Sequence, residues 1–134
     1  MNPPESTFTL LIVDDDKQNR LLLTALFEGE YRIIQAKNGV QALERARAHG
    51  PDLILLDVLM PEMDGMAVIR ALKREDATRH IPVIFITALD STADEEQGLD
   101  LGAVDYIAKP FHPSIARVRV RNHLQIVHQR RLLE

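Results

Sequence analysis

Five short apolar runs alternate with five helix-like segments along this chain of 134 residues, with turn-forming residues at nearly every junction. The apolar runs have the length of strands and lie at 7–13, 31–36, 53–56, 83–87 and 105–108. The helix-like segments lie at 17–27, 39–48, 63–73, 92–101 and after Pro113. Strands that alternate with helices are joined by right-handed crossovers, which produce a parallel sheet covered by helices on both faces.

The third run, Leu53–Leu56, is apolar at every position, as expected of a strand that is covered on both faces. A hydrophobic content of 46% supplies a packed core, and a charged content of only 27% argues against disorder. Five parallel strands suit the doubly wound, flavodoxin-like order 2-1-3-4-5, in which the first and third strands are neighbours. We therefore predict an α/β fold with this five-stranded parallel sheet and five helices.

Polar side chains stand where four of the apolar runs end. Asp14 and Asp15 follow the first run, Asp57 closes the third, Thr87 ends the fourth and Lys109 follows the fifth. In an open parallel sheet, ligands bind outside the carboxyl ends of the strands, where the strand order reverses. Each pair of carboxylates about 4 Å apart there would cost roughly 4 kcal/mol at intermediate dielectric. The sequence therefore predicts a divalent metal among the three aspartates.

Other residues near these positions have simpler interpretations. Asp16 is expected to cap the first helix, because aspartate is a preferred N-cap residue. Pro61 and Gly65 are expected to be turn and helix-start residues. The five histidines show no metal-ligand spacing and are expected at the surface; they are His49, His80, His112, His123 and His128. The absence of cysteine excludes disulfides and thiolate metal sites.

Five motifs in the order of the chain resemble the receiver domain of two-component response regulators, and chemotaxis receivers in particular. They are Leu-Ile-Val-Asp-Asp at 11–15, Leu-Leu-Asp-Val-Leu-Met-Pro at 55–61, Met-Asp-Gly at 63–65, Ile-Thr-Ala at 86–88 and Tyr-Ile-Ala-Lys-Pro-Phe at 106–111. The resemblance covers about residues 7–128, nearly the whole chain.

This resemblance implies that Asp57 is a phosphoacceptor, which takes a phosphoryl group from a phosphohistidine on a sensor histidine kinase or phosphotransfer protein. It also implies that the protein holds Mg²⁺, a hard cation that prefers oxygen ligands. The implied metal ligands are Asp14, Asp15, Asp57 and the backbone carbonyl of Leu59.

The resemblance assigns roles to the remaining motif residues as well. Lys109 would neutralise phosphoryl charge, while the Thr87 hydroxyl and the Ala88 N–H would bind a phosphoryl oxygen. The Lys109–Pro110 peptide bond would be cis. Thr87 and Tyr106 would form a switch that alters the face made by the fourth helix, fifth strand and fifth helix. Such a domain is a signalling module rather than an enzyme, because it catalyses only its own phosphoryl transfer and slow autodephosphorylation.

Three alternative functions are weighed against this one. A phosphatase of the haloacid dehalogenase type usually carries a second acid two residues after its nucleophile, where this chain has Leu59. A degenerate receiver, which binds a partner without being phosphorylated, usually lacks one of the acidic residues or the lysine, and this chain keeps them all. A structural Mg²⁺-binding module would leave Thr87 and Lys109 without a task.

Charge and hydropathy indicate a cytoplasmic domain that binds neither nucleic acid nor membrane. The net charge of −4 argues against direct nucleic-acid binding, and the first residues contain no basic leader. The most apolar stretch, 53–60, is interrupted by Asp57 and is too short to span a bilayer.

The terminal segment from Pro113 to Glu134 could form a helix of roughly 33 Å, longer than a small sheet needs. One apolar stripe of this helix is assigned to the core and comprises Ala116, Val120, Leu124 and Val127. A second stripe, nearly opposite, comprises Ile115, Val118, Ile126 and Leu133 and is interrupted by Asn122. We predict that the second stripe contacts a second copy of the chain or an output domain, with Asn122 fixing the register.

The remaining predictions for the terminal segment concern charge and domain boundaries. Its arginines are expected to form a solvated face; they are Arg117, Arg119, Arg121, Arg130 and Arg131. Residues 1–128 are assigned to the receiver domain, and 129–134 to a helix extension or the start of a linker to an output domain. The stretch 118–133 resembles receivers that lead into cyclic-di-GMP turnover domains.

Overall fold

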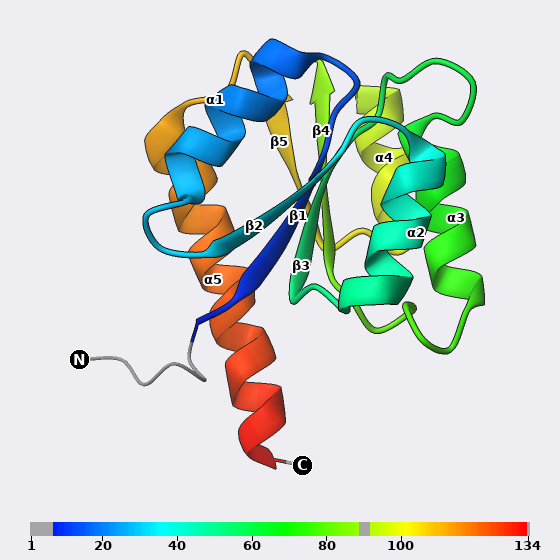
Figure 1. Ribbon diagram of the computed structural model, residues 1–134. Helices are drawn as coiled ribbons and strands as arrows, with labels where there is room; N and C mark the ends of the chain where they lie inside the picture. Colours follow the sequence, from blue (N-terminus) through cyan, green and yellow to red (C-terminus); the bar gives the residue numbers. More distant parts are fainter. Residues whose placement is uncertain (1–6, 89–91, 134) are drawn as a thin grey trace.

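The computed structural model of the protein describes residues 7–88 and 92–133. Its strands are β1 (Thr9–Val13), β2 (Arg32–Ala36), β3 (Leu53–Asp57), β4 (Val83–Ala88) and β5 (Asp105–Lys109). The alternating helices are α1 (Lys17–Phe27), α2 (Gly39–His49), α3 (Gly65–Arg74), α4 (Thr92–Asp100) and α5 (Pro113–Leu133). All strand pairs are parallel, in the order β2-β1-β3-β4-β5, which confirms the predicted fold class (Figure 1).

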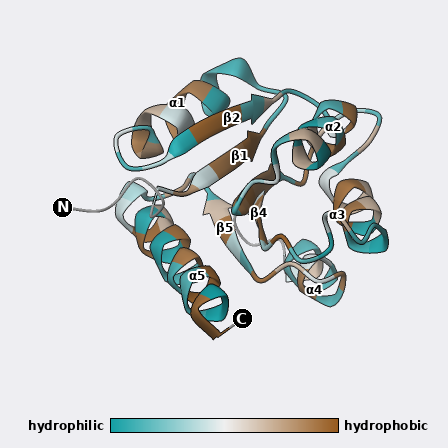
Figure 2. Ribbon diagram, turned by 60° about the horizontal axis from the view of Figure 1, so that its bottom comes forward, coloured by the Kyte–Doolittle hydropathy of each residue, from teal (hydrophilic) through white to brown (hydrophobic). Residues whose placement is uncertain are grey.

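Helices α1 and α5 cover one face of the sheet, and α2, α3 and α4 cover the other (Figure 1). Successive strand residues point to opposite faces, so each strand supplies both cores. Leu10 and Ile12 of β1 pack on the α1–α5 side, whereas Leu11 and Val13 pack on the α2–α4 side. Residues 53–56 of β3 are fully buried, which confirms the prediction of two-sided burial. Apolar residues accordingly dominate the strands in Figure 2.

Capping side chains set the first residue of three helices. Asp16, Asn38 and Asp64 each accept a hydrogen bond from the backbone N–H three residues further along the chain. The expected capping role of Asp16 is thereby confirmed. Helix α3 begins at Gly65 rather than at the predicted Met63, because Asp64 occupies the cap position.

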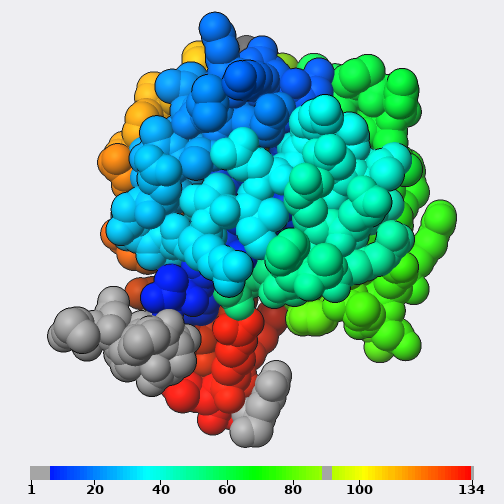
Figure 3. Space-filling model, in the orientation of Figure 1, coloured from blue at the N-terminus to red at the C-terminus, as the bar shows by residue number. Residues whose placement is uncertain are grey.

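Helix α5 runs unbroken to Leu133, and its last turns project beyond the body of the domain (Figure 3). The core stripe is confirmed for Ala116, Val120 and Leu124, which are buried, while Val127 is half-buried. All four apolar residues of the second stripe are exposed, with exposed fractions between 41% and 89%. No described helix is both long enough and apolar enough to cross a membrane.

The predictions of a solvated arginine face and of surface histidines each fail for one residue of this helix, because Asp105 of β5 contacts both of those residues. Arg119 and His123 contact the Asp105 carboxylate at 3.2 and 3.1 Å, so neither is a solvated surface residue. Arg131 pairs with Asp52, which directly precedes β3 at the amino end of the sheet, while the other histidines are exposed as expected. These ion pairs connect α5 to the edge strand β5 and to the residue that precedes β3.

Candidate functional site

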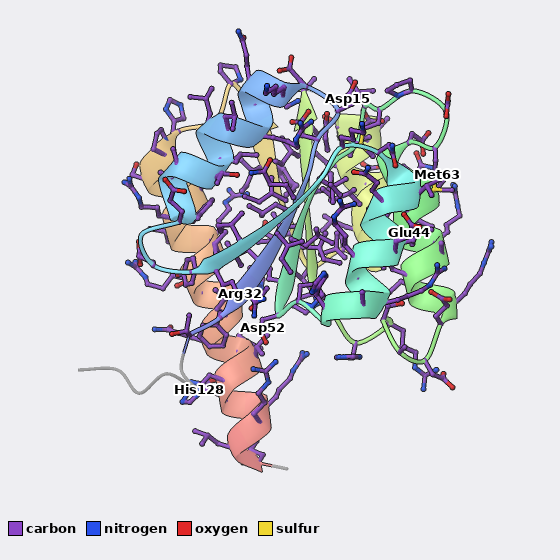
Figure 4. All side chains as sticks on the ribbon, viewed as in Figure 1. Asp15, Arg32, Glu44, Asp52, Met63 and His128 are labelled. Carbon is purple, nitrogen blue, oxygen red and sulfur yellow. The ribbon has the colours of Figure 1, made fainter. Side chains whose placement is uncertain are left out.

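The polar residues predicted from the strand ends meet at the carboxyl edge of the sheet. The register places Val13 beside Leu56, and Asp57 beside Ile86, so β1, β3 and β4 end at nearly the same level. Carboxylate oxygens of Asp14, Asp15 and Asp57 lie within 4.8 Å of one another. Figure 4 shows Asp15 at this end of the sheet and Asp52 at the other. The strand order alone therefore assembles the acidic cluster.

Lys109 provides the positive charge of this cluster. Its Nζ lies 3.4 Å from Asp57 Oδ1 and 3.7 Å from Asp14 Oδ2. The Lys109–Pro110 peptide bond is cis, as the resemblance implied. One ammonium group facing three carboxylates leaves the site with excess negative charge.

Burial makes that charge costly. Burial first, and the neighbouring Asp14 second, raise the pKa of Asp57 from 3.8 to about 6, against the opposing effects of Lys109 and the Leu59 N–H. Burial also raises the pKa of Asp14, although the Asp16 N–H and Lys109 counteract it. Ionising either carboxyl group in this site therefore costs free energy, and a bound cation would lower that cost.

The donor set fits a hard divalent cation such as Mg²⁺. Asp14 Oδ2 is buried and accepts no hydrogen bond from any described residue. The three aspartates offer carboxylate oxygens as ligands, which are the ligands that Mg²⁺ prefers. Asp14, Asp15 and Asp57 are therefore the side chains that could hold the ion.

Thr87 and Ala88 line the neighbouring strand end. Thr87 is 1% exposed, and its Oγ1 has no hydrogen-bond partner among the described residues. Ala88 is exposed, and its small side chain takes up little room at this strand end. On the β3 side, the Leu59 N–H donates to Asp57 Oδ1 at 3.2 Å, and the Leu59 side chain is 64% exposed. A buried hydroxyl without a partner is ready to bond an incoming group.

Tyr106 is half-buried between two neighbours. Its ring centroid lies 5.8 Å from that of Phe85, and the Arg119 guanidinium carbon lies 5.3 Å from the ring centroid. Arg119 also donates to the Tyr106 carbonyl. The sequence did not predict this role of Arg119, because Asp105 and Arg119 are 14 residues apart and no local pattern relates them.

Gly65 has a structural role that its helix-start position did not reveal. A Cβ on Gly65 would lie 2.5 Å from the Asp57 backbone oxygen and 2.7 Å from Val58 Cα. The Gly65 N–H also donates to the Val58 carbonyl at 2.9 Å. The start of α3 therefore rests directly on the main chain that carries Asp57.

Gly65→Ala is expected to lower the free energy of unfolding by about 1–3 kcal/mol, because backbone atoms cannot yield to the added methyl group. Urea denaturation measures the loss. Gly29→Ala is the matched control, since nothing lies within 4 Å of a Cβ at Gly29. Equal stability of the two variants would show that the start of α3 can shift at little cost.

Comparisons with known proteins agree with this geometry. The family model for the response regulator receiver domain matches residues 10–121. Response regulator PleD of Caulobacter vibrioides is 47% identical over 114 residues, which make up 84% of this chain and 25% of that protein. A Vibrio cholerae protein named "Probable cyclic di-GMP phosphodiesterase" is 44% identical over 120 residues, 90% of this chain and 27% of that protein. The chain thus spans about a quarter of the length of these curated relatives.

A solved structure extends the agreement to the metal site of a similar protein. The receiver domain of sensor histidine kinase PA1611 from Pseudomonas aeruginosa has a magnesium ion coordinated in its active site cleft. It aligns with a TM-score of 0.82 and 28% identity, over 89% of this chain and 98% of that chain.

Proposed function

Because this chain belongs to the response regulator receiver domain family, we propose that its Asp57 accepts a phosphoryl group from a phosphohistidine on a sensor histidine kinase or phosphotransfer protein. One carboxylate oxygen of Asp57 attacks phosphorus, the N–P bond of the phosphohistidine breaks, and the imidazole nitrogen keeps the electron pair. The product is an acyl phosphate on Asp57. The observation that carries the proposal is the convergence of Asp57, two further aspartates, Lys109 and an unpartnered Thr87 hydroxyl at one edge of the sheet.

We assign Asp14, Asp15, Asp57 and the Leu59 carbonyl as the Mg²⁺ ligands. When bound, Mg²⁺ supplies the positive charge that lets carboxylates and phosphoryl oxygens share one site. Lys109 adds a second positive charge, 3.4 Å from the acceptor oxygen. The Thr87 hydroxyl and the Ala88 N–H donate to a phosphoryl oxygen, and small Ala88 leaves room for it.

Phosphorylation then acts through Thr87 and Tyr106. A hydrogen bond from Thr87 to the phosphoryl group exists only in the phosphorylated state, so it can shift a conformational equilibrium. A charge-assisted bond of about 1.5–3 kcal/mol corresponds to a shift of roughly tenfold or more. Movement of Thr87 lets Tyr106 repack inward, and the face formed by α4, β5 and α5 changes with it. That face would control a partner or an output domain.

This chain offers the phosphodonor protein a docking surface beside the site. An apolar hollow of about 790 Å³ is bordered by Leu22 and Leu26 of α1 and by Phe111, and it reaches Lys109. Leu22 is 60% exposed, so the hollow has an apolar rim. A helical partner seated there would bring its histidine to the edge that carries Asp57.

The proposal extends to the setting of the domain. We propose a cytoplasmic signalling module that catalyses only its own phosphoryl transfer and slow autodephosphorylation. Its output would be a partner or a domain joined to α5, and the name of the Vibrio cholerae relative favours cyclic-di-GMP turnover. The division into a receiver domain, 1–128, and an extension, 129–134, would place the boundary inside α5.

Incubation with acetyl phosphate and Mg²⁺, followed by mass measurement of the intact protein, tests the proposed function. The expected result is one added phosphoryl group, which is labile to base as acyl phosphates are. An unchanged mass, in a protein that is folded and binds Mg²⁺, would favour the degenerate receiver that acts without phosphorylation.

The acyl phosphate is expected to be long-lived, because Leu59 lies beside the acceptor and can shield it from water without orienting a water molecule. We assign the same shielding role to Leu89, which is two residues after Thr87 and lies outside the described residues. Leu59→Asn is expected to speed the loss of the phosphoryl group at least a few-fold, as followed by intact mass over time. Leu132→Asn, a change at an exposed residue near the end of α5, is the control. Equal lifetimes in the two variants would refute the shielding role.

The exposed second stripe of α5 is expected to mediate self-association. Val118→Glu/Ile126→Glu places two charges in the stripe and should lower the sedimentation coefficient to that of a monomer. Ser114→Glu/His128→Glu adds the same charges on exposed positions outside the stripe and should leave association intact. Both are measured with and without beryllofluoride, a phosphoryl mimic. Monomers in every case, wild type included, would remove the homodimer role from this stripe.

A further inference from the structure

Asp14 is fixed at three of its four polar groups. Its N–H donates to the Ala36 carbonyl at 3.1 Å, and its carbonyl accepts from Arg20 Nη1 at 2.8 Å. Its Oδ1 accepts from the Asp16 N–H at 2.9 Å. Only Oδ2 is left without a hydrogen bond from the described residues. The carboxylate therefore presents one oxygen that accepts no hydrogen bond in the described residues, on the side of the acidic cluster and of Lys109 Nζ, which lies 3.7 Å away.

Arg20 is the side chain that reaches Asp14 from outside the cluster. It is half-buried on α1, one turn after the cap residue Asp16, whose carbonyl accepts the Arg20 N–H at 3.0 Å. Its Nε lies 3.4 Å from Gln35 Oε1 on β2. The guanidinium thus joins α1, the end of β1 and β2, and its planar fork is suited to two acceptors at once.

Arg20 touches Asp14 through the main chain rather than through the carboxylate. Both acceptors of its guanidinium, the Asp14 carbonyl and the Gln35 amide, are uncharged. No ion pair within residues 7–88 and 92–133 includes Arg20. The cation that faces the carboxylates of Asp14 and Asp57 is Lys109. Arg20 therefore holds the main chain of Asp14 in position and makes no ion pair with its carboxylate.

We infer that Arg20 is a positioning residue of the metal site, which clamps the Asp14 carbonyl so that Asp14 Oδ2 is in place before the cation binds. This inference rests on the proposed function, because it assigns a divalent cation to the acidic cluster. A ligand that is already ordered loses less conformational freedom on binding. Side chains that orient metal ligands typically contribute 10–100-fold in metal affinity.

Isothermal titration of the whole chain with Mg²⁺ tests the clamp in Arg20→Met, which keeps most of the apolar stem and removes the donors. Loss of a cation near the site strengthens the binding of a dication, whereas loss of positioning weakens it, so the sign of the change separates the two roles. The expected result is a dissociation constant about 10–100-fold higher. Arg20→Lys, which keeps one donor for the carbonyl, is expected to recover part of the affinity.

Arg45→Met is the matched control. Arg45 lines the same surface hollow of about 240 Å³ as Arg20 and Gln35, but among the described residues no hydrogen bond joins it to Asp14. Its Mg²⁺ affinity is expected to be unchanged or slightly higher. Unchanged or tighter Mg²⁺ binding in Arg20→Met, equal weakening in Arg45→Met, or a wild type that binds no Mg²⁺ would each overturn the inference.

Failure of the clamp and failure of the proposed function give different results. Without the clamp role, Arg20→Met binds Mg²⁺ as the wild type does, and acetyl phosphate still phosphorylates the wild type. Without the proposed function, acetyl phosphate leaves the wild type unmodified, while the Mg²⁺ affinities of the Arg20 and Arg45 variants still report on the clamp.

Discussion

Asp57→Asn is expected to abolish phosphorylation by acetyl phosphate completely, because an amide cannot attack phosphorus as a carboxylate does. Excess chelator should prevent the reaction in the wild type, since the buried acidic cluster admits a further anion only with a cation present. Intact mass measures both effects. Asp76→Asn, at a side chain that is 91% exposed, is the control and should be modified as the wild type is.

The same reaction should depend on pH in a defined direction. Asp57 attacks as the carboxylate, and its pKa is raised to about 6 by burial and by Asp14. The rate is therefore expected to fall as the pH drops through about 6, most clearly when Mg²⁺ is below saturation, because bound metal favours the ionised form. A phosphoryl mass that persists in Asp57→Asn, or that forms equally well in chelator, would refute the assignment of the acceptor.

Asp57→Asn is also expected to stabilise the metal-free protein by about 3 kcal/mol near neutral pH, which is the size of a pKa rise of about two units. The folded protein holds a proton on Asp57 up to a pKa of about 6, whereas the unfolded chain releases it near 3.8. Ionised Asp57 therefore lowers stability as the pH rises from 3.8 to about 6, and the full cost applies above that window. Asparagine carries no such cost.

Urea denaturation in chelator, at about pH 7 and about pH 4, measures this difference. The stability gain of the variant should shrink to a small fraction at the lower pH, where Asp57 is protonated in the folded protein and only partly ionised in the unfolded chain. Mg²⁺ at 100 times its dissociation constant should stabilise the wild type by about 2.7 kcal/mol, and the variant by less. A variant that is less stable than the wild type in chelator at neutral pH would show that ionised Asp57 is not a burden on the fold.

The sequence was sufficient to predict the fold and which side chains meet at the candidate site, for a physical reason. Parallel strands end at a common edge, so residues that close apolar runs, such as Asp57 and Thr87, must meet there. Alternation and right-handed crossovers restrict the sheet to a few doubly wound orders, of which 2-1-3-4-5 suits five strands. No comparable rule relates the caps and loops to one another.

What sequence reasoning missed depends on close approach between distant segments. Glycine is unfavourable inside a helix, but a Cβ at Gly98 of α4 would lie 2.5 Å from the Phe85 ring, so glycine is what allows this helix to reach the sheet. Arg119 and His123 looked like solvated residues until β5 placed Asp105 beside them. For the contact of Arg20 with Asp14, the sequence offered only the position of Arg20 one helical turn after the cap residue Asp16.

Helix α4 buries so few side chains that it should open to solvent locally, while the rest of the domain stays folded. Gly98 is its one buried residue, and Leu99 is 43% exposed, so few apolar contacts hold the helix to β4. Backbone amides of α4 should therefore exchange with solvent through small openings whose free energy lies far below that of global unfolding. In the proposed function, a helix held this loosely could be redirected by the single hydrogen bond that a phosphoryl group on Asp57 would accept from Thr87, whereas the strands beneath it would stay fixed.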